Sequence, residues 1–312
     1  MLGKTANGLF WMYRYLERAE NTARLIETGQ RIALTRSGAG DGEWRSILQT
    51  AGVAEGYDEG HGSLTKDQAI DWMLRSADNP SSVLSALAAA RQNARMVRTA
   101  LTHDVWEATN GTWMWAREAL SRKVAERDLP KVLHRVRERS ALVRGATDGT
   151  MLRNDIYDFL RLGTFLERAD STARILDVKY YVLLPSVAAV GSSIDNVQWE
   201  TILLSVSARG GFRMEYGSNF TPRDIAQFLI LDRRMPRSLC FCVRKIRDNL
   251  DYLGSSYGSQ PASLAKAHDL QAYLDRDIEA IFDGGLHEFI QKVLGRLGEL
   301  GRQIEIDYRF YE

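Results

Sequence analysis

The sequence predicts an all-α protein: a bundle of roughly twelve helices, built from two tandem-duplicated halves with pseudo-twofold symmetry. Apolar residues recur at spacings of three and four, with Arg, Glu and Ala between them, which is typical of amphipathic helices. No stretch alternates with period two for long enough to indicate a sheet. The segment YLERAENTARLIE at 15–27 returns as FLERADSTARILD at 165–177, with seven of thirteen positions identical.

The helices follow from this periodicity and from the punctuation between apolar runs. Asn79-Pro80 and Thr221-Pro222 each place a capping side chain before a proline at the first helical position, so both pairs should start helices. The glycine-rich stretches SGAGDGE, EGYDEGHGS, GGFRMEYGSN and GSSYGSQ should be breaks. In chain order we expect helices at 8–36, 43–54, 66–78, 80–102, 105–127, 129–145, 151–184, 195–207, 222–234, 236–253, 261–283 and 285–308.

The internal repeat extends beyond its first segment. EWRSILQTAG at 43–52 aligns with QWETILLSVS at 198–207, and NPSSVLSALAAARQN at 79–93 aligns with MPRSLCFCVRKIRDN at 235–249. The offset drifts only from about 150 to about 156 residues, which indicates duplication of a bundle rather than a solenoid of short repeats. We therefore expect two repeats, 1–149 and 150–312, packed together as one globular unit about an approximate twofold axis.

Composition argues against several partners. The 41 basic and 40 acidic side chains nearly cancel, so no large field would draw nucleic acid or an anionic membrane. No segment approaches the 18 or so apolar residues that a membrane span needs. Cys240 and Cys242 have no accompanying Cys or His cluster and are typical of core thiols in a reducing cytosol. We expect a soluble, cytoplasmic protein without nucleic-acid or membrane partners.

Charged and polar residues follow one face of each repeated helix. Glu17 and Arg24 are seven positions apart, two helical turns, and so share a face. Arg18 and Arg168 project about 100° further round. The two alanines on the apolar side of each helix would let a second helix approach closely, so we expect the repeated helices at the centre of the bundle. The aligned polar rows are Arg14, Glu17, Asn21 and Arg24 in the first copy, and Thr164, Glu167, Ser171 and Arg174 in the second.

Two interpretations of these rows stay open. In the first, the Glu and Arg residues hold neighbouring helices together through charge-assisted hydrogen bonds. In the second, they form a polar pocket that binds an anionic or zwitterionic group such as a carboxylate, which Arg beside Asn recognises well. That pocket would also include a pair of residues repeated further along each half, namely Arg91 and Asn93, and Arg247 and Asn249.

The usual sequence signs of an enzyme are absent. None of the five histidines follows a Glu by three residues, as a di-metal carboxylate site in a bundle requires. The chain has no phosphate-binding loop, no nucleophile elbow and no dinucleotide fingerprint. We expect no metal and no cofactor, and the pattern favours a non-catalytic protein.

The opening residues resemble those of the α-E domain proteins, a bacterial all-helical family. The resemblance covers essentially the whole chain and is most specific in the first 24 residues, with Phe10 as a departure where the family often has Tyr. The family's signature Glu-Arg pair corresponds to Glu17-Arg18 and, through the repeat, to Glu167-Arg168. The matching opening residues are Thr5, Ala6, Phe10, Trp11, Arg14, Tyr15, Leu16, Glu17, Arg18, Ala19, Glu20, Asn21, Thr22, Ala23 and Arg24.

The resemblance also implies a context. Members of this family are often encoded beside, or fused to, a circularly permuted ATP-grasp protein, in a proposed system of peptide synthesis or peptide modification. It implies an accessory helical component that binds the ATP-grasp partner or its peptide. The alternative is an enzyme of an unfamiliar helical type in amide or peptide bond formation, with Glu17 or Glu167 as acid or base.

Overall fold

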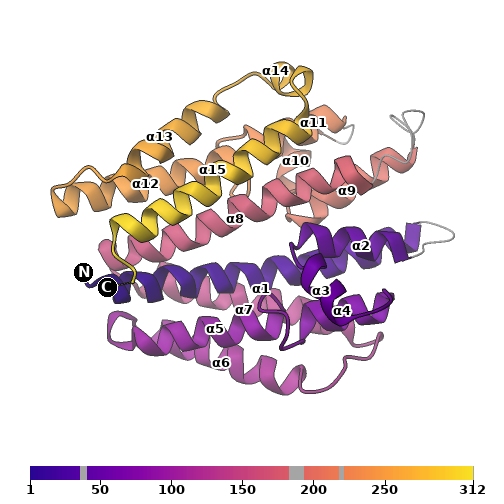
Figure 1. The fold of residues 1–312 in the computed structure, drawn as a ribbon, viewed down its shortest axis with the longest axis horizontal. Helices are drawn as coiled ribbons and strands as arrows, with labels where there is room; N and C mark the ends of the chain where they lie inside the picture. The colour runs from indigo at the N-terminus through magenta and orange to yellow at the C-terminus, as the bar shows by residue number, and fades with distance from the viewer. Residues whose placement is uncertain (36–40, 183–192, 218–220, 312) are drawn as a thin grey trace.

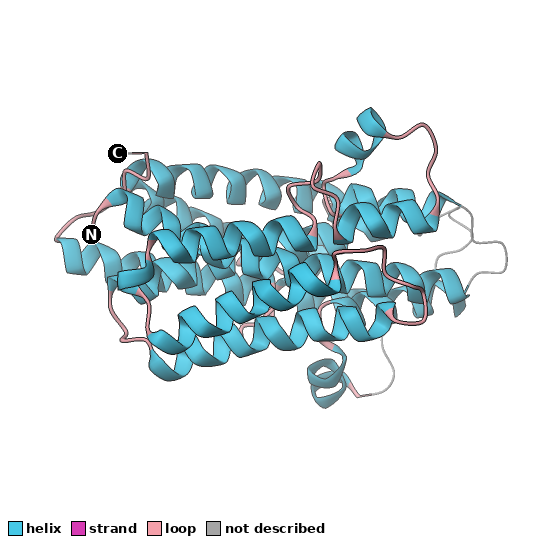
Figure 2. Ribbon diagram, turned by 90° about the horizontal axis from the view of Figure 1, so that it is seen from below, coloured by secondary structure: helices cyan, strands magenta, loops and turns pink. Residues whose placement is uncertain are grey.

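A computed structural model describes residues 1–35, 41–182, 193–217 and 221–311. Helices form most of this described part, and no strand occurs in it (Figure 2). The first half contains α1 (Gly3–Thr35), α2 (Asp41–Thr50), α3 (Ala54–Gly60), α4 (Lys66–Leu74), α5 (Val83–Met96), a 3-10 turn (Arg98–Ala100), α6 (His103–Ala119) and α7 (Leu129–Thr150). The second contains α8 (Asp155–Val182), α9 (Ser193–Ser205), α10 (Arg209–Tyr216), α11 (Pro222–Ile230), α12 (Leu239–Tyr257), α13 (Ala262–Leu274), α14 (Ile278–Asp283) and α15 (Leu286–Asp307).

The prediction of an all-α fold is confirmed, but the described residues form fifteen α-helices rather than roughly twelve. Two of the glycine-rich stretches that were predicted to be breaks contain short helices, α3 and α10. In α10, Phe212 stacks on Tyr216 one turn later, with ring centroids 4.7 Å apart, and this burial outweighs the cost of Gly210 and Gly211. The predicted helix 261–283 divides into α13 and α14 at Asp275. Parts of the predicted SGAGDGE and GGFRMEYGSN breaks, and the predicted helix end at 184, lie outside the described residues.

The capping residues decide where several helices begin. The Thr221 and Asp224 side chains form the predicted capping box at the start of α11. The predicted start of α5 at Pro80 is wrong, because the Ser82 hydroxyl accepts the Ser85 N–H and caps the helix instead. Ser238 caps α12 in the same way, by accepting the Phe241 N–H at 3.0 Å.

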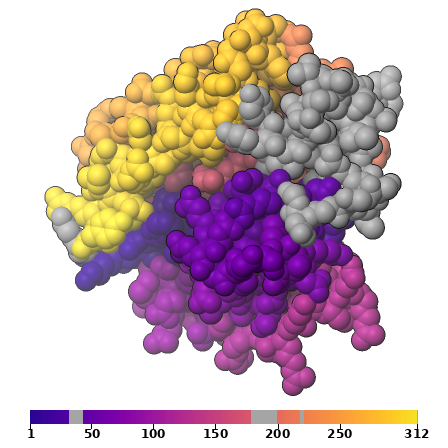
Figure 3. Space-filling view, turned by 45° about the vertical axis from the view of Figure 1, so that its right-hand side comes forward, coloured from indigo at the N-terminus to yellow at the C-terminus, as the bar shows by residue number. Residues whose placement is uncertain are grey.

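The two repeated helices, α1 and α8, lie at the centre of the bundle and pack along each other (Figure 1). Helix α1 also packs on α5 and α7, and α8 packs on α12 and α15. Helices α1–α7 occupy the lower part of Figure 1 and α8–α15 the upper part, and the two chain termini lie side by side. In the face drawn in Figure 3, the first half and the yellow C-terminal helix occupy opposite sides of the molecule.

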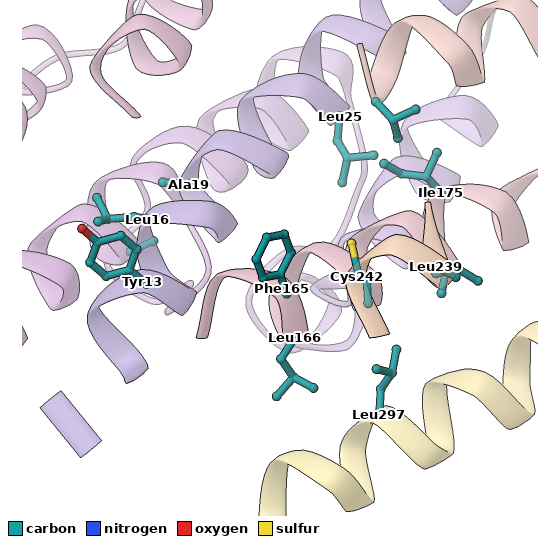
Figure 4. Close-up of a cluster of buried hydrophobic side chains, with 14 of the residues drawn as sticks. Tyr13, Leu16, Ala19, Leu25, Phe165, Leu166, Ile175, Leu239, Cys242 and Leu297 are labelled. Atoms are coloured by element: carbon teal, nitrogen blue, oxygen red, sulfur yellow. The ribbon is translucent and has the colours of Figure 1, made fainter. Parts of the chain in front are cut away.

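Small residues let the central helices approach closely. Ala19, Ala23, Ala169 and Ala173 are fully buried, as their apolar positions predict. At Gly163 of α8 the approach is so close that a Cβ atom would overlap the Phe10 carbonyl oxygen of α1. The surrounding core is apolar. Figure 4 shows part of it, with Leu166 of α8 directed toward α15, the helix that carries Leu297. Among the described helices, none is long and apolar enough to cross a membrane.

Candidate functional site

The two Glu-Arg pairs exchange partners between the central helices. Arg18 of α1 donates to Glu167 of α8, from Nε to Oε1 at 2.6 Å and from Nη2 to Oε2 at 3.0 Å. Arg168 of α8 donates to Glu17 of α1, from Nε to Oε1 at 2.9 Å and from Nη2 to Oε2 at 3.0 Å. Both contacts are bidentate, the strongest geometry available to a guanidinium and a carboxylate. Each arginine, projecting about 100° from its adjacent glutamate, thereby reaches the opposite helix.

Further guanidinium groups surround both glutamates. Arg237, in the turn before α12, places Nη1 2.9 Å from Glu17 Oε1, and Arg144 of α7 lies 3.7 Å from Glu17 Oε2. Arg14 donates to Glu167 Oε2 at 2.8 Å. The side chains of Glu17 and Glu167 are only 2% and 7% exposed. Both are therefore buried where α1 and α8 pack together.

Burial and ion pairing oppose each other in the pKa of these carboxyl groups. Burial alone raises the pKa of Glu17, but the charges of Arg168 and Arg237 outweigh it and hold that pKa below its ordinary value. Burial likewise raises the pKa of Glu167, but the charges of Arg18 and Arg14 outweigh it, so that this pKa is also below its ordinary value. Both groups are therefore ionised at neutral pH.

A third carboxylate, Glu20, belongs to the same cluster, although the polar rows predicted from the sequence do not include it. It is fully buried and accepts from Arg24 Nη2 at 2.6 Å and from Arg237 Nη2 at 3.0 Å, and it pairs with Arg144. The spacing of four between Glu20 and Arg24 is a signal that could have found this pair. Arg24 therefore pairs with the glutamate one turn away rather than with Glu17, two turns away.

The same local pairing recurs in the second copy. Arg174 Nε donates to Asp170 Oδ2 at 2.7 Å, although this pair is partly exposed. Arg144 and Arg237 could not be found by the periodicity of the repeated helix, because they lie on other elements. The one sequence feature that sets Arg237 apart is a difference between the repeats: the position aligned with it in the first half is Ser81.

Four residues expected in a polar pocket lie elsewhere. Asn93 lies ten residues beyond Val83, the first residue of α5, and so about 15 Å along the helix from the turn that holds Ser81. Arg91 Nε donates to Asn110 on α6, and Asn93 Nδ2 to the Ala89 carbonyl within α5. On α12, Arg247 pairs with Asp248, and Asn249 donates to the Lys245 carbonyl. The structure therefore does not bring Arg91, Asn93, Arg247 and Asn249 to the Glu-Arg cluster.

A polar cavity of about 200 Å³ lies against one side of the cluster. Arg174 is 41% exposed in its side chain and Gly52 is exposed, so the cavity opens to solvent on their side. Its lining comes from α1, α8, the end of α2 and the turn before α5, and comprises Arg18, Asn21, Thr22, Leu25, Thr50, Ala51, Gly52, Ser81, Glu167, Asp170, Ser171 and Arg174.

These features define a class: all-α bundles whose two central helices exchange buried Glu-Arg ion pairs. The chain belongs to the Alpha-E family, described as a predicted alpha-helical domain with a conserved ER motif, whose model matches residues 1–308. The expected family membership is therefore confirmed.

Curated relatives include uncharacterized proteins of Mycobacterium bovis and of two strains of Mycobacterium tuberculosis. Each is 23% identical over 316 aligned positions, which cover 93% of this chain and 35% of the relative. The chain thus spans about a third of the length of these relatives. No solved structure matches it.

Proposed function

We propose that the chain is a tandem duplication whose halves, 1–149 and 150–312, pack about an approximate twofold axis. Aligned residues making the same contacts support this: Arg18 binds Glu167 as Arg168 binds Glu17. At aligned positions in the turns after α2 and α9, Gly52 and Ser207 both have positive φ, 68° and 52°. The helix neighbours also correspond, since α1 packs on α5, α7 and α9, and α8 packs on α12, α15 and α2.

We further propose that the protein is a non-catalytic, accessory component of an ATP-dependent peptide synthesis or modification system. The observation that supports this best is the burial of Glu17 and Glu167, each bound by at least two guanidinium groups. A charge held in this way stabilises the contact between α1 and α8, and its arginine partners keep it ionised rather than ready to exchange a proton.

The alternative, catalysis by Glu17 or Glu167 as acid or base, is less well supported by the same geometry. A general acid or base must reach the proton that it moves, and its pKa must lie near the working pH. Glu17 and Glu167 are buried, and their pKa values are lowered, away from neutrality.

The proposed partner is a circularly permuted ATP-grasp protein, and the proposed ligand is that partner or its peptide. The family resemblance is the ground for this partner. The matched region makes up only 35% of each relative. This is consistent with a helical unit that works beside further protein. The proposal assigns the protein to the cytoplasm, where ATP is available to such a ligase.

Co-expression with the ATP-grasp protein tests the proposal. We expect the two proteins to co-purify and to form a stoichiometric complex at micromolar concentration, measured by size-exclusion chromatography with light scattering. We also expect ligase product to rise until the helical protein equals the ligase in amount, because an accessory subunit acts only while it is bound. No complex at micromolar concentration, or full product at a small fraction of that amount, would contradict an accessory role.

A further inference from the structure

Arg237 occupies a buried position next to α1, and the corresponding position in the other half of the molecule is a serine. Its guanidinium contacts Glu17 Oε1 at 2.9 Å, Glu20 Oε1 at 3.0 Å and Asn21 Oδ1 at 3.1 Å. The sequence repeat aligns Arg237 with Ser81. The surrounding backbone corresponds too, because Thr172 donates to the Arg237 carbonyl as Thr22 donates to the Ser81 carbonyl.

The cavity lies where the repeat would put a second arginine side chain. The residues aligned with the three partners of Arg237 are Glu167, Asp170 and Ser171, and all three line the cavity, as does Ser81. The cavity volume of about 200 Å³ is several times the share of liquid volume of one water molecule, about 30 Å³. It is large enough for a guanidinium group on part of its aliphatic stem.

The acidic residues of the cavity retain hydrogen-bonding capacity. A carboxylate has about four lone-pair sites. Asp170 accepts two bonds, both from Arg174, and Glu167 accepts three, from Arg14 and Arg18. At the filled position, Glu17 and Glu20 each accept one further contact from Arg237. The acceptors that hold Arg237 thus have counterparts in the cavity with room for an additional donor.

The charges also match. Without Arg237, Glu17 and Glu20 face Arg24, Arg144 and Arg168, a net charge of +1. Glu167 and Asp170 face three arginines as well, again a net charge of +1: Arg14, Arg18 and Arg174. The groups around Glu17 and Glu20 accommodate a further guanidinium, that of Arg237, in the folded protein. The groups around Glu167 and Asp170 are more open to water, so a cation bound there loses less hydration.

An independent observation points to a ligand that also carries an acceptor. Asn21 is 5% exposed and lines the cavity, and its Nδ2 has no hydrogen-bond partner among the described residues. A buried amide N–H without an acceptor is costly, so a group that accepts from it would be stabilising. A peptide carbonyl oxygen is such a group.

We propose that this cavity binds an arginine residue of a peptide, with its guanidinium between Glu167, Asp170 and Ser171 and a carbonyl oxygen accepting from Asn21. This inference rests on the proposed duplication and on the peptide ligand of the proposed function, but it does not require the ATP-grasp partner. It is therefore tested on the isolated chain, and its failure is distinguishable from the absence of a complex.

The probe is N-acetyl-arginine N-methylamide, and the neutral isostere N-acetyl-citrulline N-methylamide is its comparison. Calorimetry or NMR titration should show saturable binding of the arginine compound, and at least about tenfold weaker binding of the citrulline compound, because one charged hydrogen bond is worth about that factor. Equal binding of both compounds, no saturation at millimolar concentration, or displacement by acetate would overturn the proposal.

Ser81→Arg should fill the cavity with the protein's own guanidinium and abolish binding of the arginine compound. Ser121→Arg, which adds the same charge at an exposed site, should leave binding unchanged. If Ser81→Arg does not fold, Asp170→Asn serves instead, because it removes an acceptor from a partly exposed pair and should weaken binding about tenfold or more. Undiminished binding in a folded Ser81→Arg or Asp170→Asn protein would contradict the assignment.

Discussion

Arg168 Nε lies 2.9 Å from Glu17 Oε1, although the two residues are 151 positions apart in the chain. The contact joins α8 to α1 at the centre of the bundle, and Arg18 and Glu167 form the reverse contact. Desolvating such groups is costly, and the cost is offset only while each charge keeps its partner. The exchanged pairs therefore favour one register of α1 against α8, because a slipped register would leave charges buried and unpaired.

Glu17→Gln should strongly destabilise the protein. The change leaves Arg168 and Arg237 buried without their shared carboxylate, and breaking a buried pair in this way costs about 3–5 kcal/mol. Urea unfolding followed by circular dichroism would measure the loss in free energy of unfolding. Glu138→Gln is the matched control. It removes an exposed carboxylate that pairs with Arg135, so it should change stability little. A Glu17→Gln protein as stable as this control would contradict the structural role.

Arg237→Met should destabilise the protein less than Arg168→Met. Burial lowers the pKa of Arg237 to about 10, and Arg168 and Arg24 also lower it, against the opposing effect of Glu17 and Glu20. The guanidinium of Arg237 is therefore held at a cost, whereas that of Arg168 is stabilised by its bidentate pair with Glu17. We expect a loss of about 3–5 kcal/mol for Arg168→Met and at least about 1 kcal/mol less for Arg237→Met. Urea midpoints of the two variants in the reverse order would refute this.

The protein should lose stability in acid. The pKa values of Glu17, Glu20 and Glu167 are lowered in the folded state, because their arginine partners outweigh burial. Such groups stabilise the folded state fully above the unfolded pKa of about 4.5, and the contribution is lost as pH falls below it. Urea midpoints recorded from neutral pH to about pH 3 should fall most steeply below about pH 4.5. The fall should be shallower in Glu167→Gln, which lacks one of these carboxyl groups, and an unchanged slope would count against the assignment.

Asp158→Asn should stabilise the protein, and more so at higher pH. Burial and the nearby charge of Asp155 raise the pKa of Asp158 from 3.8 to about 6, against the effect of Arg161. Because the folded state binds the proton more tightly, stability falls as pH rises from about 4 to about 6 and stays lower above that. The gain in melting temperature of Asp158→Asn over wild type should widen across this range. Asp283→Asn, at an exposed site, should show no such widening.

Gly163→Ala should disrupt the contact between α1 and α8. The added Cβ would overlap the Phe10 carbonyl oxygen, and backbone cannot move aside as a flexible side chain can. We expect a loss of about 1–3 kcal/mol, the usual cost of overpacking, in the free energy of unfolding. Gly145→Ala on α7 is the matched control, because a Cβ there meets nothing within 4 Å. It should stabilise the protein by about 0.5–1 kcal/mol through helix propensity. Equal effects of the two changes would exclude a close approach at Gly163.

Sequence periodicity was sufficient for the parts of the structure that depend on near neighbours. It predicted the all-α fold, the apolar faces of α1 and α8 and their central place, because these follow from residues three and four apart. It failed at α3 and α10, where the burial of an aromatic side chain such as Phe212 overcomes local glycines. It also misplaced the start of α5 at Pro80, because Asn79 accepts the Ser81 N–H in a turn before the helix and Ser82 forms the cap.

The sequence by itself determined that a Glu-Arg pair occurs twice on equivalent helix faces. Only the tertiary structure decided that each arginine binds the glutamate of the other helix, that Arg144 and Arg237 join them, and that Arg91 and Asn93 do not. The physical reason is that helical periodicity depends on residues within one or two turns, whereas the partner of a buried charge is whichever opposite charge the packing of distant segments brings within reach.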